Sequence, residues 1–200
     1  SCCGQPAYNS GYQKNTAELA RKFIHDFEGE RVIVSPGASC SAFIRNYYPS
    51  MLKDSKEEHH CASLASRLVE LTDFLVNRLK LRDIGAEFHH KVTYHDSCSA
   101  LREYGIKQEP RLLLENVKGL ELIEMEGSEV CCGFGGTFSV KHTAISSAMV
   151  EQKVQNAIKS GAEYIVTTEA SCLMNIEGYI KKNNMPIKAI HIADILASGL

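Results

Sequence analysis

The sequence has no tryptophan, few prolines and no long apolar run. Of its 200 residues, 5 are proline and 44% are hydrophobic, and 22 Lys and Arg nearly balance 24 Asp and Glu, which leaves a net charge of −2. Without excess positive charge there is no electrostatic basis for binding nucleic acid. Without a run of about 20 apolar residues there is no membrane span, and no signal peptide is visible. We therefore expect a cytoplasmic globular protein.

Cysteine is the residue type in excess, with 8 copies. Cytosolic thiols are kept reduced, so this number indicates metal binding or catalysis rather than a disulfide framework. The C-x2-C pairs typical of zinc knuckles are absent from the sequence. The chain also starts at Ser1 with a cysteine pair directly behind it, and not with methionine. From this start we expect that an upstream stretch is missing.

An internal repeat organises the cysteines. The first copy starts at Cys2-Cys3-Gly4 and ends at Ser39-Cys40, and the second starts at Cys131-Cys132-Gly133 and ends at Ser171-Cys172. The second cysteine of the pair lies 37 positions before the third cysteine in the first copy and 40 positions before it in the second. Chance rarely aligns a vicinal pair, an apolar strand and a third cysteine twice in one chain.

Each copy is predicted to contain a helix followed by a short buried strand. In the first copy a helix begins near Asn15 and a strand covers 31–35. In the second copy a helix ends at Gly161 and a strand covers 164–168. Short apolar strands that alternate with helices are typical of parallel sheets. The predicted fold is α/β, with two pseudo-symmetric repeats, parallel-type sheets flanked by helices, and cysteines at the carboxyl ends of strands.

The segment between the copies is predicted to be one long amphipathic helix over 54–80, because leucines recur every three or four positions. These are Leu64, Leu68, Leu71, Leu75 and Leu79. Strands are predicted over 92–95 and 120–125. These elements place the domain boundary after residue 82. Residues 1–82 are predicted to form the first repeat with the linking helix, and residues 83–200 the second.

The cysteines of the second copy form the strongest candidate site, because each follows a predicted strand or opens a predicted helix. They are Cys98, Cys131, Cys132 and Cys172. Helix N-termini supply N–H groups and a positive dipole end that stabilise thiolates. Four thiolates suit an iron–sulfur cluster or an all-thiolate zinc site. The adjacent pair favours a polynuclear cluster, because neighbouring side chains point in different directions.

The cysteine pattern and the segments 2–11 and 131–141 resemble the cysteine-rich CCG domain family. This family includes a cysteine-rich subunit of heterodisulfide reductase, the iron–sulfur subunit of glycolate oxidase and subunits that serve lactate utilization. The resemblance covers the whole chain and implies two such domains, related by a pseudo-twofold axis. It also implies a cysteine upstream of each pair, which Cys98 supplies in the second copy. In the first copy the cofactor-binding candidates are Cys2, Cys3 and Cys40 alone, which supports an N-terminal truncation.

The family motif normally ends in C-x2-C, and this chain departs from it. Where the motif has its final cysteine, this chain has Phe43 in the first copy and Asn175 in the second. The departure disfavours the noncubane cluster of heterodisulfide reductase, together with disulfide cleavage at a cluster. It favours a [4Fe–4S] cluster held by four cysteines.

The resemblance implies an iron–sulfur subunit that relays electrons in a complex oxidising L-lactate to pyruvate. The implied partners are a ferredoxin-type cluster protein and a small companion subunit. Two alternatives stay open: an iron–sulfur subunit of a glycolate or other 2-hydroxy-acid oxidase, and a zinc-loaded structural or assembly module. An iron–sulfur protein purified without oxygen is brown, whereas a zinc protein is colourless. The sequence identifies no catalytic residue.

Five further residues are weighed as site candidates. His95 precedes Cys98 and is interpreted as a ligand, a proton donor, a partner of a ligand or a hydrogen-bonded structural residue. His191 is expected to cap a helix. Cys61 is expected to be a buried free thiol rather than a ligand. Lys141 and Arg102 lie near the cysteine segments, where a positive charge could bind a substrate carboxylate. The alternative interpretation, which we take as the default, is that both are solvated surface residues. These are secondary to the cysteines.

Overall fold

A computed structural model describes residues 2–199, so Ser1 and Leu200, the outer ends of the two predicted domains, lie outside the described residues. The first half contains α1 (Gln5–Asn9), α2 (Gln13–Asp26), β1 (Ile33–Ser35), α3 (Ala38–Met51), α4 (Glu58–Arg67), β2 (Leu68–Glu70), α5 (Leu71–Asp73) and the π-helical turn η1 (Phe74–Arg78). The second half contains β3 (Lys91–Tyr94), the π-helical turn η2 (Ala100–Tyr104), α6 (Gln108–Leu114), β4 (Glu121–Leu122), α7 (Thr137–Lys141), α8 (Thr143–Lys159), β5 (Tyr164–Thr167), α9 (Ala170–Lys182), β6 (Lys188–His191) and α10 (Ile192–Leu196). Within residues 2–199, no helix combines the length and the apolar character that a membrane crossing requires.

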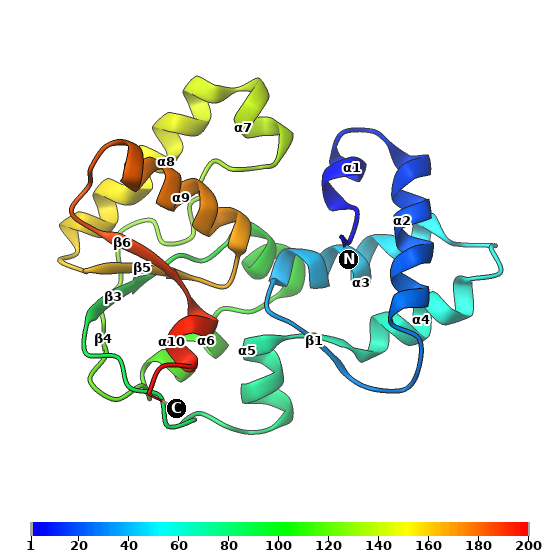
Figure 1. Ribbon diagram of the computed structural model, residues 1–200, viewed down its shortest axis with the longest axis horizontal. Helices are drawn as coiled ribbons and strands as arrows, with labels where there is room; N and C mark the ends of the chain where they lie inside the picture. The colour runs from blue at the N-terminus through cyan, green and yellow to red at the C-terminus, as the bar shows by residue number, and fades with distance from the viewer. Residues whose placement is uncertain (1, 200) are drawn as a thin grey trace.

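Two parallel sheets carry the fold. Figure 1 shows the strands of the larger one. The larger has the strand order β4-β3-β5-β6, and the smaller pairs β1 with β2. The register places Val92 of β3 beside both Leu122 of β4 and Tyr164 of β5. Strand β4 is shorter than the predicted 120–125. The predicted α/β fold with parallel sheets flanked by helices is confirmed.

Both faces of the larger sheet are buried under helices. Val166 of β5 packs toward α10, in one apolar cluster with Ile192. Its neighbour Ile165 belongs to the cluster on the opposite face, with Val154 of α8 and Ile176 of α9. Successive strand residues point to opposite faces, so a strand covered on both sides is apolar throughout. Full burial of each such side chain contributes about 1.5–3 kcal/mol.

The two predicted repeats have the same order of elements. The first runs α2, β1, α3 and the second runs α8, β5, α9. Helix α2 buries Ala20, Phe23 and Ile24 on one face, as their spacing predicts. Gly161 follows α8 with φ of +80°, the left-handed conformation that favours glycine after a helix. The pseudo-symmetry therefore places Cys40 and Cys172 at corresponding positions, each in the first turn of the helix after a strand.

The predicted long helix over 54–80 is wrong. The chain forms α4, breaks into the short strand β2 and continues through α5 and η1. Leu68 is buried because β2 pairs in parallel with β1, where Ile33 is its partner. Glu70 then ends the strand and caps α5 through its side chain. Leucines three or four positions apart are therefore buried by two different kinds of element.

The buried carboxyl of Glu70 gives a testable pH dependence. Glu70 is 0% exposed, and one of its oxygens accepts from Thr72 N at 2.7 Å and from Thr72 Oγ1 at 2.6 Å. Burial raises the pKa of Glu70 from 4.5 to about 7, although these hydrogen bonds oppose the rise. The folded state therefore binds more protons than the unfolded state between these pH values. Stability is full below pH 4.5 and falls as the pH rises through 7.

We expect the Glu70→Gln variant to match the parent protein at pH 5 and to exceed it at pH 8 by about 1–3 kcal/mol in free energy of unfolding. The amide keeps the accepting oxygen but carries no charge. Urea denaturation of the reduced, metal-free protein at both pH values measures the difference. A variant that is less stable than the parent at pH 8 would contradict the role given to burial.

A carboxylate of the second repeat holds the cysteine-bearing helix of the first. Glu169 precedes α9, is 3% exposed and accepts from the backbone N–H of Ser39 and, at 2.6 Å, from its hydroxyl. Ser39 lies in the first turn of α3, next to Cys40. A small apolar cluster that includes Ala38 and Ala100 packs beside this contact. The first turn of α3 is therefore capped from the other repeat.

Candidate metal centre

Four cysteines from three separate segments meet in the second repeat. Cys98 follows β3, the Cys131–Cys132 pair lies in the loop after β4, and Cys172 lies in the first turn of α9. The Sγ atoms of Cys132 and Cys172 are 3.1 Å apart. Cys131 lies close enough to Cys132 and Cys98 for both of them to lower its pKa. The four sulfurs predicted to act together therefore form one continuous chain of contacts.

The close contacts between these sulfurs shift their pKa values in opposite directions. Hydrogen bonding from Cys132 lowers the pKa of Cys172 to about 5, and hydrogen bonding with Cys132 and Cys98 lowers the pKa of Cys131. The same contacts raise the pKa of Cys132 and of Cys98. Thiolates bind metals, and a bound metal replaces the protons that hold neighbouring sulfurs together. The donor set therefore fits a thiophilic metal centre.

Backbone groups approach the sulfurs closely. Gly133 N–H points at Cys131 Sγ, with a donor–acceptor distance of 3.4 Å. Gly133 has φ of +85°, and a Cβ there would lie 2.7 Å from the carbonyl oxygen of Ser146 in α8. Only glycine fits this position without a clash. The Asn175 side chain donates to the Cys132 carbonyl at 2.8 Å and holds the loop against α9.

The first repeat contains a smaller copy of this arrangement. Cys3 Sγ and Cys40 Sγ are 3.2 Å apart, and Gly4 N–H points at Cys2 Sγ at 3.4 Å. The Tyr48 hydroxyl donates to the Cys3 carbonyl at 2.7 Å. Hydrogen bonding from Cys40 lowers the pKa of Cys3 to about 7. The structure thus brings Cys3 and Cys40 into contact, with the exposed Cys2 beside them in the chain.

Comparison with known proteins identifies the family. The sequence profile of the cysteine-rich domain called CCG matches residues 1–45 and 92–177. The chain belongs to the CCG cysteine-rich domain family. Both matched segments contain a vicinal cysteine pair followed by glycine. The repeat inferred from the spacing of the cysteines is therefore a repeat of the CCG unit.

The chain is also similar along nearly its whole length to proteins called lactate utilization protein A. It is 43% identical to the one from Bacillus subtilis over 197 residues, which cover 98% of this chain and 83% of that protein. It is 43% identical to the one from a Geobacillus species over 198 residues, 99% of this chain and 83% of that protein. It is 46% identical to the one from Bacillus licheniformis, with 98% and 83% covered.

A buried lysine beside the second CCG site was not predicted. Lys153 of α8 is 2% exposed, and its Nζ donates to the Gly127 carbonyl at 2.5 Å and to the Ser128 carbonyl at 3.1 Å. Burial lowers its pKa to about 8, although negative charge on the nearby cysteines opposes this shift. The position was visible in the sequence, because Lys153 lies between the apolar residues Val150 and Val154 on the buried face of α8. The charge of Lys153 therefore interacts favourably with negative charge on Cys132.

His95 lies fully buried at the end of β3, beside the sulfur chain. Its Nδ1 is 3.2 Å from the Ser128 carbonyl oxygen, and its Nε2 has no hydrogen-bond partner among the described residues. One ring nitrogen of His95 and the sulfurs of Cys132 and Cys172 all lie within 4.8 Å of one another. His95, whose role the sequence did not decide, therefore lies at the site.

The remaining sequence candidates lie outside the sulfur chain. His191 Nδ1 accepts from the N–H of Ala193 at 3.1 Å, which confirms that it caps α10. Cys61 is 1% exposed, and burial raises its pKa, as expected of an unreactive thiol. Lys141 and Arg102 are exposed to solvent, as expected for solvated surface residues.

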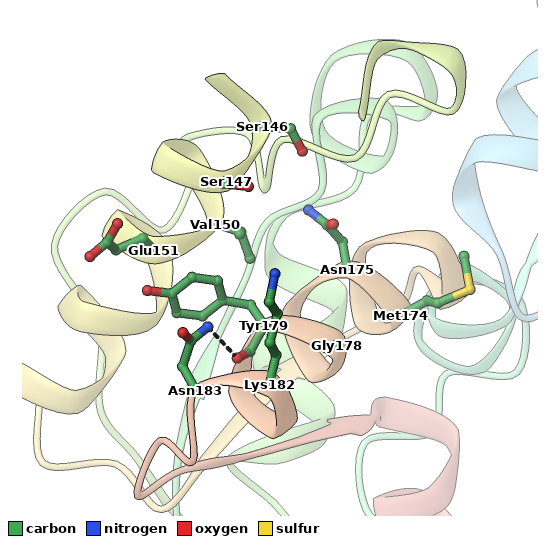
Figure 2. A pocket seen from close by; sticks show the side chains of 10 residues that line it. All are labelled: Ser146, Ser147, Val150, Glu151, Met174, Asn175, Gly178, Tyr179, Lys182 and Asn183. Atoms are coloured by element: carbon green, nitrogen blue, oxygen red, sulfur yellow. Dashed lines mark hydrogen bonds between the residues drawn. The ribbon is translucent and has the colours of Figure 1, made fainter. Parts of the chain in front are cut away.

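Figure 2 shows an open groove along α8 and α9. It has a volume of about 450 Å³, and its lining includes Ser146, Asn175, Tyr179 and Lys182. Asn175 faces the groove in Figure 2 and also binds the carbonyl of Cys132. This side chain therefore connects the groove lining to the loop that carries the cysteine pair.

Proposed function

We propose that the second CCG repeat binds a [4Fe–4S] cluster and that the chain is the electron-transfer subunit of a complex that oxidises L-lactate to pyruvate. The observation that carries the proposal is the meeting of four sulfurs from three segments in one chain of contacts. The proposed ligands are Cys98, Cys131, Cys132 and Cys172. The similarity to lactate utilization protein A supports the substrate.

Such a cluster supplies one-electron redox chemistry when it is bound. The residues of this chain hold the sulfurs, shield them from water and place positive charge beside them. The N–H of Gly133, the first turn of α9 and the ammonium of Lys153 all favour an anionic group at the four sulfurs. The burial of Cys132, which is 2% exposed, limits access of water to the centre.

The first repeat is proposed to bind a second cofactor through Cys2, Cys3 and Cys40. The sulfur contact at 3.2 Å and the N–H at 3.4 Å reproduce the second site. We propose residues 1–82 and 83–200 as the two domains. The proposed partners are a ferredoxin-type cluster protein and a small companion subunit. The proposed substrate class is a small 2-hydroxy acid, and the complex is proposed to act in the cytoplasm.

The test is anaerobic reconstitution followed by counts of iron, sulfide and zinc per chain. We expect a brown protein with equal amounts of iron and sulfide, little zinc, and a paramagnetic signal after reduction. With both companion subunits present, L-lactate is expected to reduce the cluster faster than glycolate does. A colourless protein with bound zinc and no sulfide would refute the proposal.

A further inference from the structure

The hydrogen bonds of His95 fix which ring nitrogen is free. A carbonyl oxygen only accepts hydrogen bonds, so the contact between His95 Nδ1 and the Ser128 carbonyl at 3.2 Å requires a proton on Nδ1. In the neutral imidazole, Nε2 then carries no proton and its lone pair is free to bind a ligand. This nitrogen is buried. The side chain of His95 also interacts with Cys172, because it contributes to the lowered pKa of that thiol.

Histidine that binds a metal usually donates its other ring N–H to a carbonyl or carboxylate, which is the arrangement of His95. The Cys132 and Cys172 sulfurs complete a set of three buried donors within 4.8 Å of one another. A tetrahedral ion keeps two thiolates about 3.8 Å apart. The two sulfurs are 3.1 Å apart and share a proton, so a modest opening admits a metal in place of that proton.

We propose that His95 is a direct ligand, through Nε2, of the metal centre that Cys132 and Cys172 hold. The inference rests on the proposed metal centre but not on its being an iron–sulfur cluster. The class of ligand is a thiophilic cation, which is either a single divalent ion or an iron of the cluster. In the cluster His95 would take the place of one of the four cysteines, because each iron takes one protein ligand. A neutral nitrogen donor leaves the centre less negative than a thiolate would, and histidine ligation raises the potential of iron–sulfur centres.

The test uses Co²⁺ as a spectroscopic probe of the reduced, metal-free chain. The decisive variant is His95→Asn, because the shorter amide reproduces the Nδ1 donor to Ser128 and removes Nε2. The matched control is His191→Asn at another strand end, where asparagine also caps a helix well. We expect His95→Asn to weaken Co²⁺ binding at least about 100-fold and to change its visible spectrum, whereas the control behaves like the parent.

A second measurement needs no variant. In the iron-loaded chain grown with ¹⁵N-histidine, pulsed electron paramagnetic resonance of the reduced cluster is expected to show one strongly coupled ¹⁵N nucleus. Full iron and sulfide loading without this coupling would overturn ligation by His95 and leave the proposed function intact. A chain that takes up no sulfide, yet shows Co²⁺ binding that depends on His95, would keep the ligation and refute the cluster. Unchanged Co²⁺ affinity in His95→Asn would also overturn the inference.

Discussion

A Cys132→Ser variant is expected to lose the cluster of the second repeat, and with it the transfer of electrons from lactate. Cys132 is the central sulfur of the chain of contacts, because it touches both Cys131 and Cys172. A serine hydroxyl is a harder and shorter donor than a thiolate, so it leaves one ligand position unfilled. Iron and sulfide at this site should fall at least about tenfold.

Cys61→Ala is the matched control for this prediction. Cys61 is as deeply buried as Cys132, at 1% against 2% exposed, but it lies in α4 within the core of the first repeat. The control should keep the paramagnetic signal of the second site and the lactate-dependent rate. If Cys132→Ser also kept both, the four cysteines would not be the ligands. Circular dichroism of the metal-free chains shows whether each variant is folded.

An Arg111→Met variant is expected to lose about 3–5 kcal/mol of stability, because it leaves the Asp96 carboxylate buried without its partner. The Asp96 side chain is 1% exposed, and Arg111 binds it through two hydrogen bonds of 2.8 Å. Urea denaturation of the metal-free protein at pH 7.5 measures the loss. The double variant Asp96→Asn, Arg111→Met should recover much of it, because no charge is then left buried.

The same pair predicts an acid transition. Burial opposes ionisation of Asp96, but the hydrogen bonds and charge of Arg111 outweigh it and hold its pKa below the ordinary 3.8. The stability from this pair is therefore present above pH 3.8 and is lost as the pH falls through the lowered value. Lys107→Met is a control, because the exposed pair of Lys107 and Glu129 should contribute nothing measurable. Equal losses of stability in Arg111→Met and Lys107→Met would contradict the role given to burial of the Asp96–Arg111 pair.

The sequence predicted the features that depend on local spacing or on repetition. Two vicinal pairs with matched third cysteines indicated two similar sites, because a duplicated pattern signals a duplicated structure. The buried face of α2 followed from apolar residues at helical spacing. The parallel sheet followed from short apolar strands between helices. Each of these inferences uses information from neighbouring residues or from a comparison of two segments.

The sequence failed where a distant partner decides the outcome. Leu68 lies in a strand because β1, 35 positions earlier, offers an open edge, and leucine spacing alone does not distinguish this from a helix. The environment of Lys153 depends on two carbonyls 25 and 26 positions earlier in the chain. His95 stayed ambiguous because its role depends on which ring nitrogen meets a carbonyl. These facts come from tertiary contacts and have no local pattern.

The contact between Glu169 and Ser39 has an evolutionary consequence. A duplicated domain can diverge freely only while each copy stays self-sufficient. Here the carboxylate of one copy closes the end of the helix that carries Cys40 in the other. A gene split between the repeats would therefore produce an incomplete first fragment that regains its native helix start only when co-expressed with the second. The first unit depends on the second for the start of this helix, and the two are expected to be inherited as one polypeptide.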